Sequence, residues 1–179
     1  MTSTFRTLSM ALGASLGMAA LAASGTSHAA TIASKFKSNA SGVCQSAFSA
    51  GAGAVVRTRP LAIQNEGASN AFVTCSVPYN EDAGEQPNAM GFGAYFVNNT
   101  AAPVDVSCTL VSGTPRIGAN YVVKETTLPP GDVQEFIAFF PADLPDAPAT
   151  IFAPNLSCGL PPGVGIQYLY YYYDRQIGT

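Results

Sequence analysis

The sequence predicts an all-β protein: an antiparallel β-sandwich of about eight strands with two disulfides, in a jelly-roll or immunoglobulin-like arrangement. Apolar residues alternate without a break from Pro103 to Gly113, which is the period-two pattern of a strand with one buried face. Such a strand needs antiparallel neighbours and a second layer, and further segments show the same alternation without a convincing helix. The 17 glycines and 13 prolines supply the turns between short strands.

Residues 1–29 have the pattern of a signal peptide. Arg6 is the only Lys, Arg, Asp or Glu among them, a long apolar run follows, and Ser27 and Ala29 fit the −3 and −1 positions of a cleavage site. Cleavage after Ala30 is the alternative. Glycines and serines interrupt the run, which disfavours a membrane anchor. We therefore expect a bacterial protein that is secreted or periplasmic, with no membrane insertion after cleavage.

The mature chain of roughly 150 residues suits one domain. We expect a loose, polar N-terminal arm over residues 30–43 and a single sandwich domain over residues 44–179. Beyond a first strand near Cys44, the alternating segments predict strands at 54–66 (with Pro60 inside, hence at an edge or a bulge), 70–77, 91–99, 103–113, 120–128, 133–140, 149–153 and 164–175. The segment 133–140 is apolar on both faces toward its end, which predicts a central position. The PPG triplets at 129–131 and 161–163 predict turns.

The four cysteines, Cys44, Cys75, Cys108 and Cys158, form an even set without a CxxC pair. In an oxidising compartment this predicts two disulfides rather than a zinc site. We favour Cys44 with Cys75 and Cys108 with Cys158, because each pair joins sequence neighbours that can lie on adjacent strands. A bridge between Cys75 and Cys108 is the rival, since both lie on apolar faces.

Charge and histidine content exclude several classes of function. The formal net charge is −3 and no Lys/Arg cluster exists, which argues against a nucleic-acid partner. The single histidine, His28, lies in the predicted leader, so histidine-dependent nucleophile activation and histidine metal ligation are excluded for the mature chain. We expect a protein that is not an enzyme. A pair of carboxylates, as in glycosidases, remains open.

Two stretches are candidate binding sites. Tyr168, Tyr170 and Tyr172 share one face of the last predicted strand, where their rings could stack on sugars or fill a protein interface. The alternative is a central strand whose rings lie in the core. In the second stretch, the acidic loop, carboxylates and an amide oxygen could chelate calcium, the one candidate cofactor; its residues are Asn80, Glu81, Asp82 and Glu85. Its spacing matches no EF-hand, and a solvated loop is the simpler interpretation.

The segments NEGASNAFVTCSVP, NNTAAPVDVSCTL and CGLPPGVGI resemble a group of small, secreted, uncharacterised bacterial β-sandwich proteins. The resemblance implies export and a sandwich fold, and it transfers no activity and no site residues. Our first hypothesis is a non-catalytic module that binds a glycan or a protein. The alternatives are a secreted carboxylate-dependent hydrolase and an assembly subunit or inhibitor that acts through an exposed strand or loops.

Overall fold

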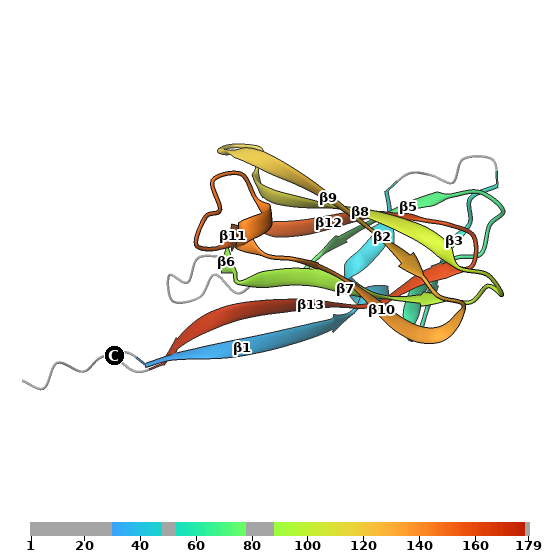
Figure 1. The fold of residues 1–179 in the computed structure, drawn as a ribbon, viewed down its shortest axis with the longest axis horizontal. Coiled ribbons are helices and arrows are strands. Elements are labelled where there is room, and N and C mark those ends of the chain that lie inside the picture. The colour runs from blue at the N-terminus through green and yellow to red at the C-terminus, as the bar shows by residue number, and fades with distance from the viewer. Residues whose placement is uncertain (1–29, 48–52, 78–87, 178–179) are drawn as a thin grey trace, which may run out of the picture.

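A computed structural model describes residues 30–47, 53–77 and 88–177, and these form two antiparallel sheets packed face to face (Figure 1). Sheet A has the order β10-β7-β13-β4-β3, and β1 also pairs with β13. Its strands are β1 (Ala30–Asn39), β3 (Val56–Arg59), β4 (Ala62–Asn65), β7 (Gly91–Asn98), β10 (Gly131–Phe139) and β13 (Val164–Ile177). The prediction of an antiparallel β-sandwich is confirmed.

Sheet B has the order β2-β5-β12-β8-β9. Its strands are β2 (Cys44–Ser46), β5 (Ala71–Ser76), β8 (Val104–Thr114), β9 (Gly118–Leu128) and β12 (Pro154–Leu160). The short strands β6 (Asn88–Ala89) and β11 (Ile151–Phe152) pair with each other, and the helical pieces are α1 (Ala40–Val43) and the 3-10 turn η2 (Pro141–Asp143). No described helix is long and apolar enough to cross a membrane.

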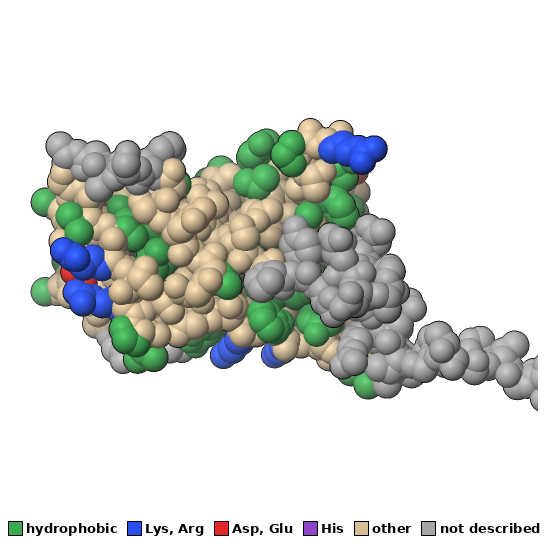
Figure 2. Space-filling model, turned by 180° about the vertical axis from the view of Figure 1, so that it is seen from behind, with side chains coloured by type: hydrophobic (Ala, Val, Ile, Leu, Met, Phe, Trp, Pro, Cys, Tyr) green, Lys and Arg blue, Asp and Glu red, His purple; other side chains and the backbone are tan. Residues whose placement is uncertain are grey.

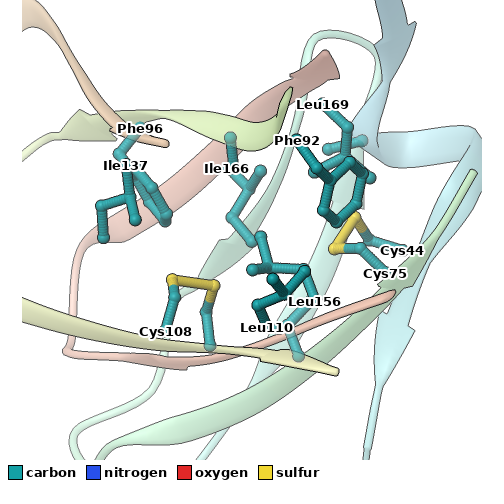
Figure 3. Packing of buried hydrophobic residues seen from close by; sticks show 14 of the residues in the cluster. Cys44, Cys75, Phe92, Phe96, Cys108, Leu110, Ile137, Leu156, Ile166 and Leu169 are labelled. Carbon is teal, nitrogen blue, oxygen red and sulfur yellow. A yellow bond between two sulfur atoms is a disulfide. The ribbon is translucent and has the colours of Figure 1, made fainter. Parts of the chain in front are cut away.

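The core lies between the two sheets and contains both disulfides (Figure 3). Sheet A contributes Phe92, Phe96 and Ile166, and sheet B contributes Leu110 and Leu156, all 0% exposed. The bridges join Cys44 to Cys75 and Cys108 to Cys158. This is the favoured pairing, and each bridge joins residues directly opposite each other on neighbouring strands of sheet B.

Six predicted strands appear where alternation placed them, as β5, β7, β8, β9, β10 and β13. In β8 the inward side chains of Val106, Cys108 and Leu110 are buried, while those between them are more exposed. Both PPG triplets are turns in which the glycine has positive φ, 91° at Gly131 and 80° at Gly163.

Two expectations for the N-terminal half are wrong. The segment predicted as a loose arm over 30–43 contains strand β1 and the helical turn α1, because its residues 30–39 pair in register with residues 168–177 of β13. The segment 54–66 is not one strand. It forms the hairpin β3–β4, and Pro60 lies in the turn, where no ladder hydrogen bond is needed from its nitrogen.

Two further corrections concern the C-terminal half. Strand β10 lies at an edge of sheet A rather than at its centre. It is apolar on both faces because Ile137 and Phe139 enter the core while Phe136 joins ring contacts on the outer face. Strand β12, which we did not predict, lies inside sheet B between β5 and β8. Its inward residues are Pro154, Leu156, Cys158 and Leu160.

Candidate functional site

The tyrosines of β13 divide between the two faces of sheet A. Tyr171 belongs to the core cluster and Tyr173 packs against it. Tyr168, Tyr170 and Tyr172 alternate with these residues and project from the outer face. The neighbouring strand β7 places Tyr95 opposite Tyr168, and β10 places Phe136 opposite Tyr95. Three strands thus bring aromatic side chains to one surface.

These five side chains, Tyr95, Phe136, Tyr168, Tyr170 and Tyr172, form a continuous cluster that we call the aromatic face. The ring of Tyr95 lies 4.6 Å from Phe136 and 4.7 Å from Tyr168, centroid to centroid. Tyr170 lies 4.4 Å from Phe136 and 4.8 Å from Tyr172. These separations are typical of favourable aromatic pairs, so each ring fixes the position of its neighbours.

Two glycines of β7 make room for the cluster. In the ladder Gly93 lies opposite Tyr170 and Gly91 lies opposite Tyr172. A Cβ atom at Gly93 would lie 3.0 Å from Cε1 of Tyr170 and 2.1 Å from the carbonyl oxygen of Ile137. A Cβ at Gly91 would meet the rings of Phe140 and Tyr172 at 3.2 and 3.3 Å. The rings therefore cover the backbone of β7, where any other residue would push them outward.

Tyr170 is the base of the cluster rather than a contact surface. It is 4% exposed, whereas Tyr95, Phe136, Tyr168 and Tyr172 are all half-buried and reach solvent. Burial raises the pKa of the Tyr170 phenol far above its ordinary value, and the nearby Tyr172 and Tyr95 phenols raise it further. Of the three tyrosines singled out from the sequence, Tyr168 and Tyr172 are thus accessible to a ligand.

Two lysines of β1 lie beside the aromatic face. Lys35 is opposite Tyr172 and Lys37 is opposite Tyr170, so both project from the same side of sheet A as these rings. The Lys37 Nζ lies 4.5 Å from the ring centroid of Tyr168 and 5.5 Å from that of Tyr95. The Lys35 Nζ lies 4.8 Å from the centroid of Tyr172. Each ammonium group is within cation–π distance of a ring.

Sequence reasoning missed four members of this surface: Tyr95, Phe136, Lys35 and Lys37. Strand alternation assigns Tyr95 and Phe136 each to one face of its strand, but which strands are neighbours depends on the sheet order. Lys35 and Lys37 were assigned to the loose arm. Their signal was the alternation of SKFKS, in which both lysines fall on the same face of a strand.

The predicted calcium ligands Asn80, Glu81, Asp82 and Glu85 lie outside the described residues. Within the described ranges, no group of three or more Asp, Glu, His or Cys residues could hold a metal ion. An open hollow lies beside β2 and β5. It is lined by Gly42, Val43, Cys44, Gln45, Thr74, Ser76 and Val77. None of these side chains is a carboxylate, so the hollow supplies no acid–base pair. Figure 2 shows few charged side chains on the face in view, and these lie toward its margins.

The outer face of sheet B provides a contrast. There the edge strand β9 exposes Tyr121 and Val123, which are 69% and 58% exposed. No ring contact of Tyr121 is found among the described residues. The exposed ring of Tyr121 is therefore a natural control for the clustered rings on sheet A.

No protein-family model and no curated protein matches the sequence. Two of the solved structures that match the chain have the following identity, coverage and TM-score. PfGH50B has 10% sequence identity and a TM-score of 0.47 over 83% of this chain, which spans 24% of that protein. A family 11 carbohydrate-binding module from Clostridium thermocellum, solved with a β-1,3-1,4-mixed-linked tetrasaccharide, has 6% identity and a TM-score of 0.40; the match covers 78% of this chain and 87% of the module.

Proposed function

We propose that this protein is an exported, non-catalytic β-sandwich that binds a glycan through the aromatic face. The observation that carries the proposal is the continuous cluster of five rings on the outer side of sheet A, four of which reach solvent. Tyrosine combines an apolar ring body with a polar hydroxyl. Such a surface suits sugars, which present C–H groups on their ring faces and hydroxyl groups around the rim.

The cluster is held in place before any ligand arrives. Tyr170 is buried beneath its neighbours, and the backbone of β7 at Gly91 and Gly93 lies directly under the rings. Little side-chain freedom then remains to be lost on binding, which favours affinity. Two disulfides fit the oxidising compartment in which an exported protein would meet a glycan.

A thermal-shift screen of the oxidised mature protein against a polysaccharide panel tests the proposal. A ligand that binds only the native state raises the unfolding midpoint. For a glycan that raises the midpoint, we expect the Tyr168→Ala variant to bind about tenfold or more weakly than the wild type. This loss corresponds to about 1.4 kcal/mol of binding free energy.

The matched control is Tyr121→Ala, which removes the same side chain from the outer face of sheet B. This variant should bind as the wild type does. The proposal is wrong if the protein melts cooperatively and no glycan raises its unfolding midpoint. It is also wrong if both variants lose affinity for the glycan equally.

A further inference from the structure

We infer that the glycan bound by the aromatic face is anionic, a polymer that carries carboxylate or sulfate groups on its sugars. This inference rests on the proposed function and names its ligand class. It is carried by the positions of Lys35 and Lys37, which are exposed and lie on the ligand side of the rings.

The two lysines are cations without an acidic partner within the described residues. The described ion pairs join Arg57 and Arg59 to Glu66, and Lys124 to Asp143. Asp174 shares the outer face of β13 but lies opposite Ala33, and it forms no ion pair with either lysine. In a chain of net charge −3, Lys35 and Lys37 therefore form a local positive patch beside the rings.

The ammonium groups also control access to the rings. Because Lys37 lies over Tyr168 and Tyr95, and Lys35 over Tyr172, a sugar that stacks on these rings must contact or displace them. A neutral sugar would displace them and forfeit the cation–π contacts. A sugar with a carboxylate or sulfate would instead accept charge-assisted hydrogen bonds from the same ammonium groups while its ring stacks on tyrosine.

The spacing of the lysines favours a polymer. Residues i and i+2 of a strand lie on one face about 7 Å apart along its axis. Lys35 and Lys37 therefore present two cations in a row that runs alongside Tyr172, Tyr170 and Tyr168 on β13. A chain with repeated negative groups can engage both cations while successive sugars lie on the rings.

The experiment compares matched ligands that differ only in charge. Polygalacturonate is measured against highly methyl-esterified pectin, and dextran sulfate against dextran, by affinity electrophoresis and calorimetry at two salt concentrations. We expect at least one charged polymer to bind tenfold or more tightly than its neutral counterpart, with affinity that falls as salt rises. A preference in the pectin comparison would indicate a carboxylate ligand, and a preference in the dextran comparison would indicate a sulfate ligand.

The double variant Lys35→Gln, Lys37→Gln should abolish this preference and leave the unfolding midpoint nearly unchanged, since both side chains are exposed. The control Arg116→Gln removes an exposed cation from the loop between β8 and β9 and should keep the preference.

Equal binding of charged and neutral polymers, sensitive to Tyr168→Ala, would overturn this inference and leave the proposed function intact. Absence of binding to every polymer would overturn both. Single-stranded DNA is included because aromatic rings beside cations also suit nucleic acid. Tighter binding of DNA than of any glycan, lost in the double lysine variant, would overturn the glycan assignment.

Discussion

Tyr170 differs from the other rings of the aromatic face because it has almost no contact with water. Its neighbours Tyr95, Phe136 and Tyr172 surround it, and Gly93 lies opposite it on β7. The phenol must therefore remain neutral in the native state, because a tyrosinate there would lose its hydration. This residue contributes rigidity to the surface, while Tyr168 and Tyr172 contribute contact area.

The raised pKa of Tyr170 predicts a loss of stability at high pH. Above its ordinary pKa of about 10, the unfolded chain releases the phenol proton while the native chain retains it. The contribution of Tyr170 to stability is thus complete below pH 10 and falls above it, with a limiting slope of about 1.4 kcal/mol per pH unit.

Urea unfolding at pH 9 and pH 11 measures this loss in the wild type and in Tyr170→Phe. We expect the variant to lose less stability over this interval. The control Tyr121→Phe removes an exposed phenol and should follow the wild type. Identical pH dependence in Tyr170→Phe and the wild type would contradict the prediction.

At the scale of elements, Lys124 joins the two sheets. It lies on β9 of sheet B, yet its Nζ donates to the carbonyl oxygen of Ala138 on β10 at 2.9 Å and to Oδ2 of Asp143 at 2.6 Å. Burial raises the pKa of Asp143, but hydrogen bonds from Lys124 and from the Phe140 N–H, with the lysine charge, outweigh this and hold the pKa below its ordinary value. The edge strands β9 and β10 are therefore linked.

We expect Lys124→Gln to lower the free energy of unfolding by about 1–2 kcal/mol, because hydrogen bonds to charged groups contribute more than neutral ones and partial exposure weakens them. Chemical denaturation at pH 7 measures the loss. The control is Arg57→Gln, whose ion pair with Glu66 is 60% exposed on the arginine side and should contribute less than about 0.5 kcal/mol. Equal losses in both variants would mean that Lys124 does not link the sheets.

The lowered pKa of Asp143 also predicts how stability changes at low pH. The stability that it contributes is present above its ordinary pKa and is lost as pH falls through the lowered value. The difference in stability between wild type and Lys124→Gln should therefore shrink in acid.

At the scale of the whole molecule, both disulfides are buried in the core. Cys75, Cys108 and Cys158 are 0% exposed and Cys44 is 8% exposed. Both bridges lie within sheet B, so sheet A relies on its hydrogen bonds and on packing of its inner face against sheet B. A reductant can reach the sulfur atoms when the sandwich opens.

We therefore expect native protein treated with dithiothreitol and iodoacetamide to remain unlabelled until urea unfolds it, as read by mass spectrometry. Replacing Cys108 and Cys158 by alanine should cost about 2–5 kcal/mol, which is typical of the loss of a native disulfide. Rapid labelling of all four cysteines without denaturant would show that the sandwich opens readily.

Alternation and cysteine positions allowed much of the fold to be predicted. Strands β5, β7, β8, β9, β10 and β13 follow from alternation within a few residues. The disulfide partners are 31 and 50 residues apart, and the sequence favoured this pairing without excluding the bridge between Cys75 and Cys108. Strand β12 was missed because its Pro154 and Gly159 read as loop residues, although Leu156, Cys158 and Leu160 alternate inward. Strand β1 was missed because an edge strand with polar side chains lacks a buried apolar face. Its strand conformation comes from its pairing with β13.

The candidate site could be predicted only in part. The sequence determined that Tyr168, Tyr170 and Tyr172 share one face, because the side-chain period of a strand is two. It could not decide which face is outward, because that depends on where the second sheet packs. Neither could it bring Tyr95, Phe136, Lys35 and Lys37 to the same surface. Those residues come from three other strands, and only the pairing order of sheet A, set by long-range packing, places them together.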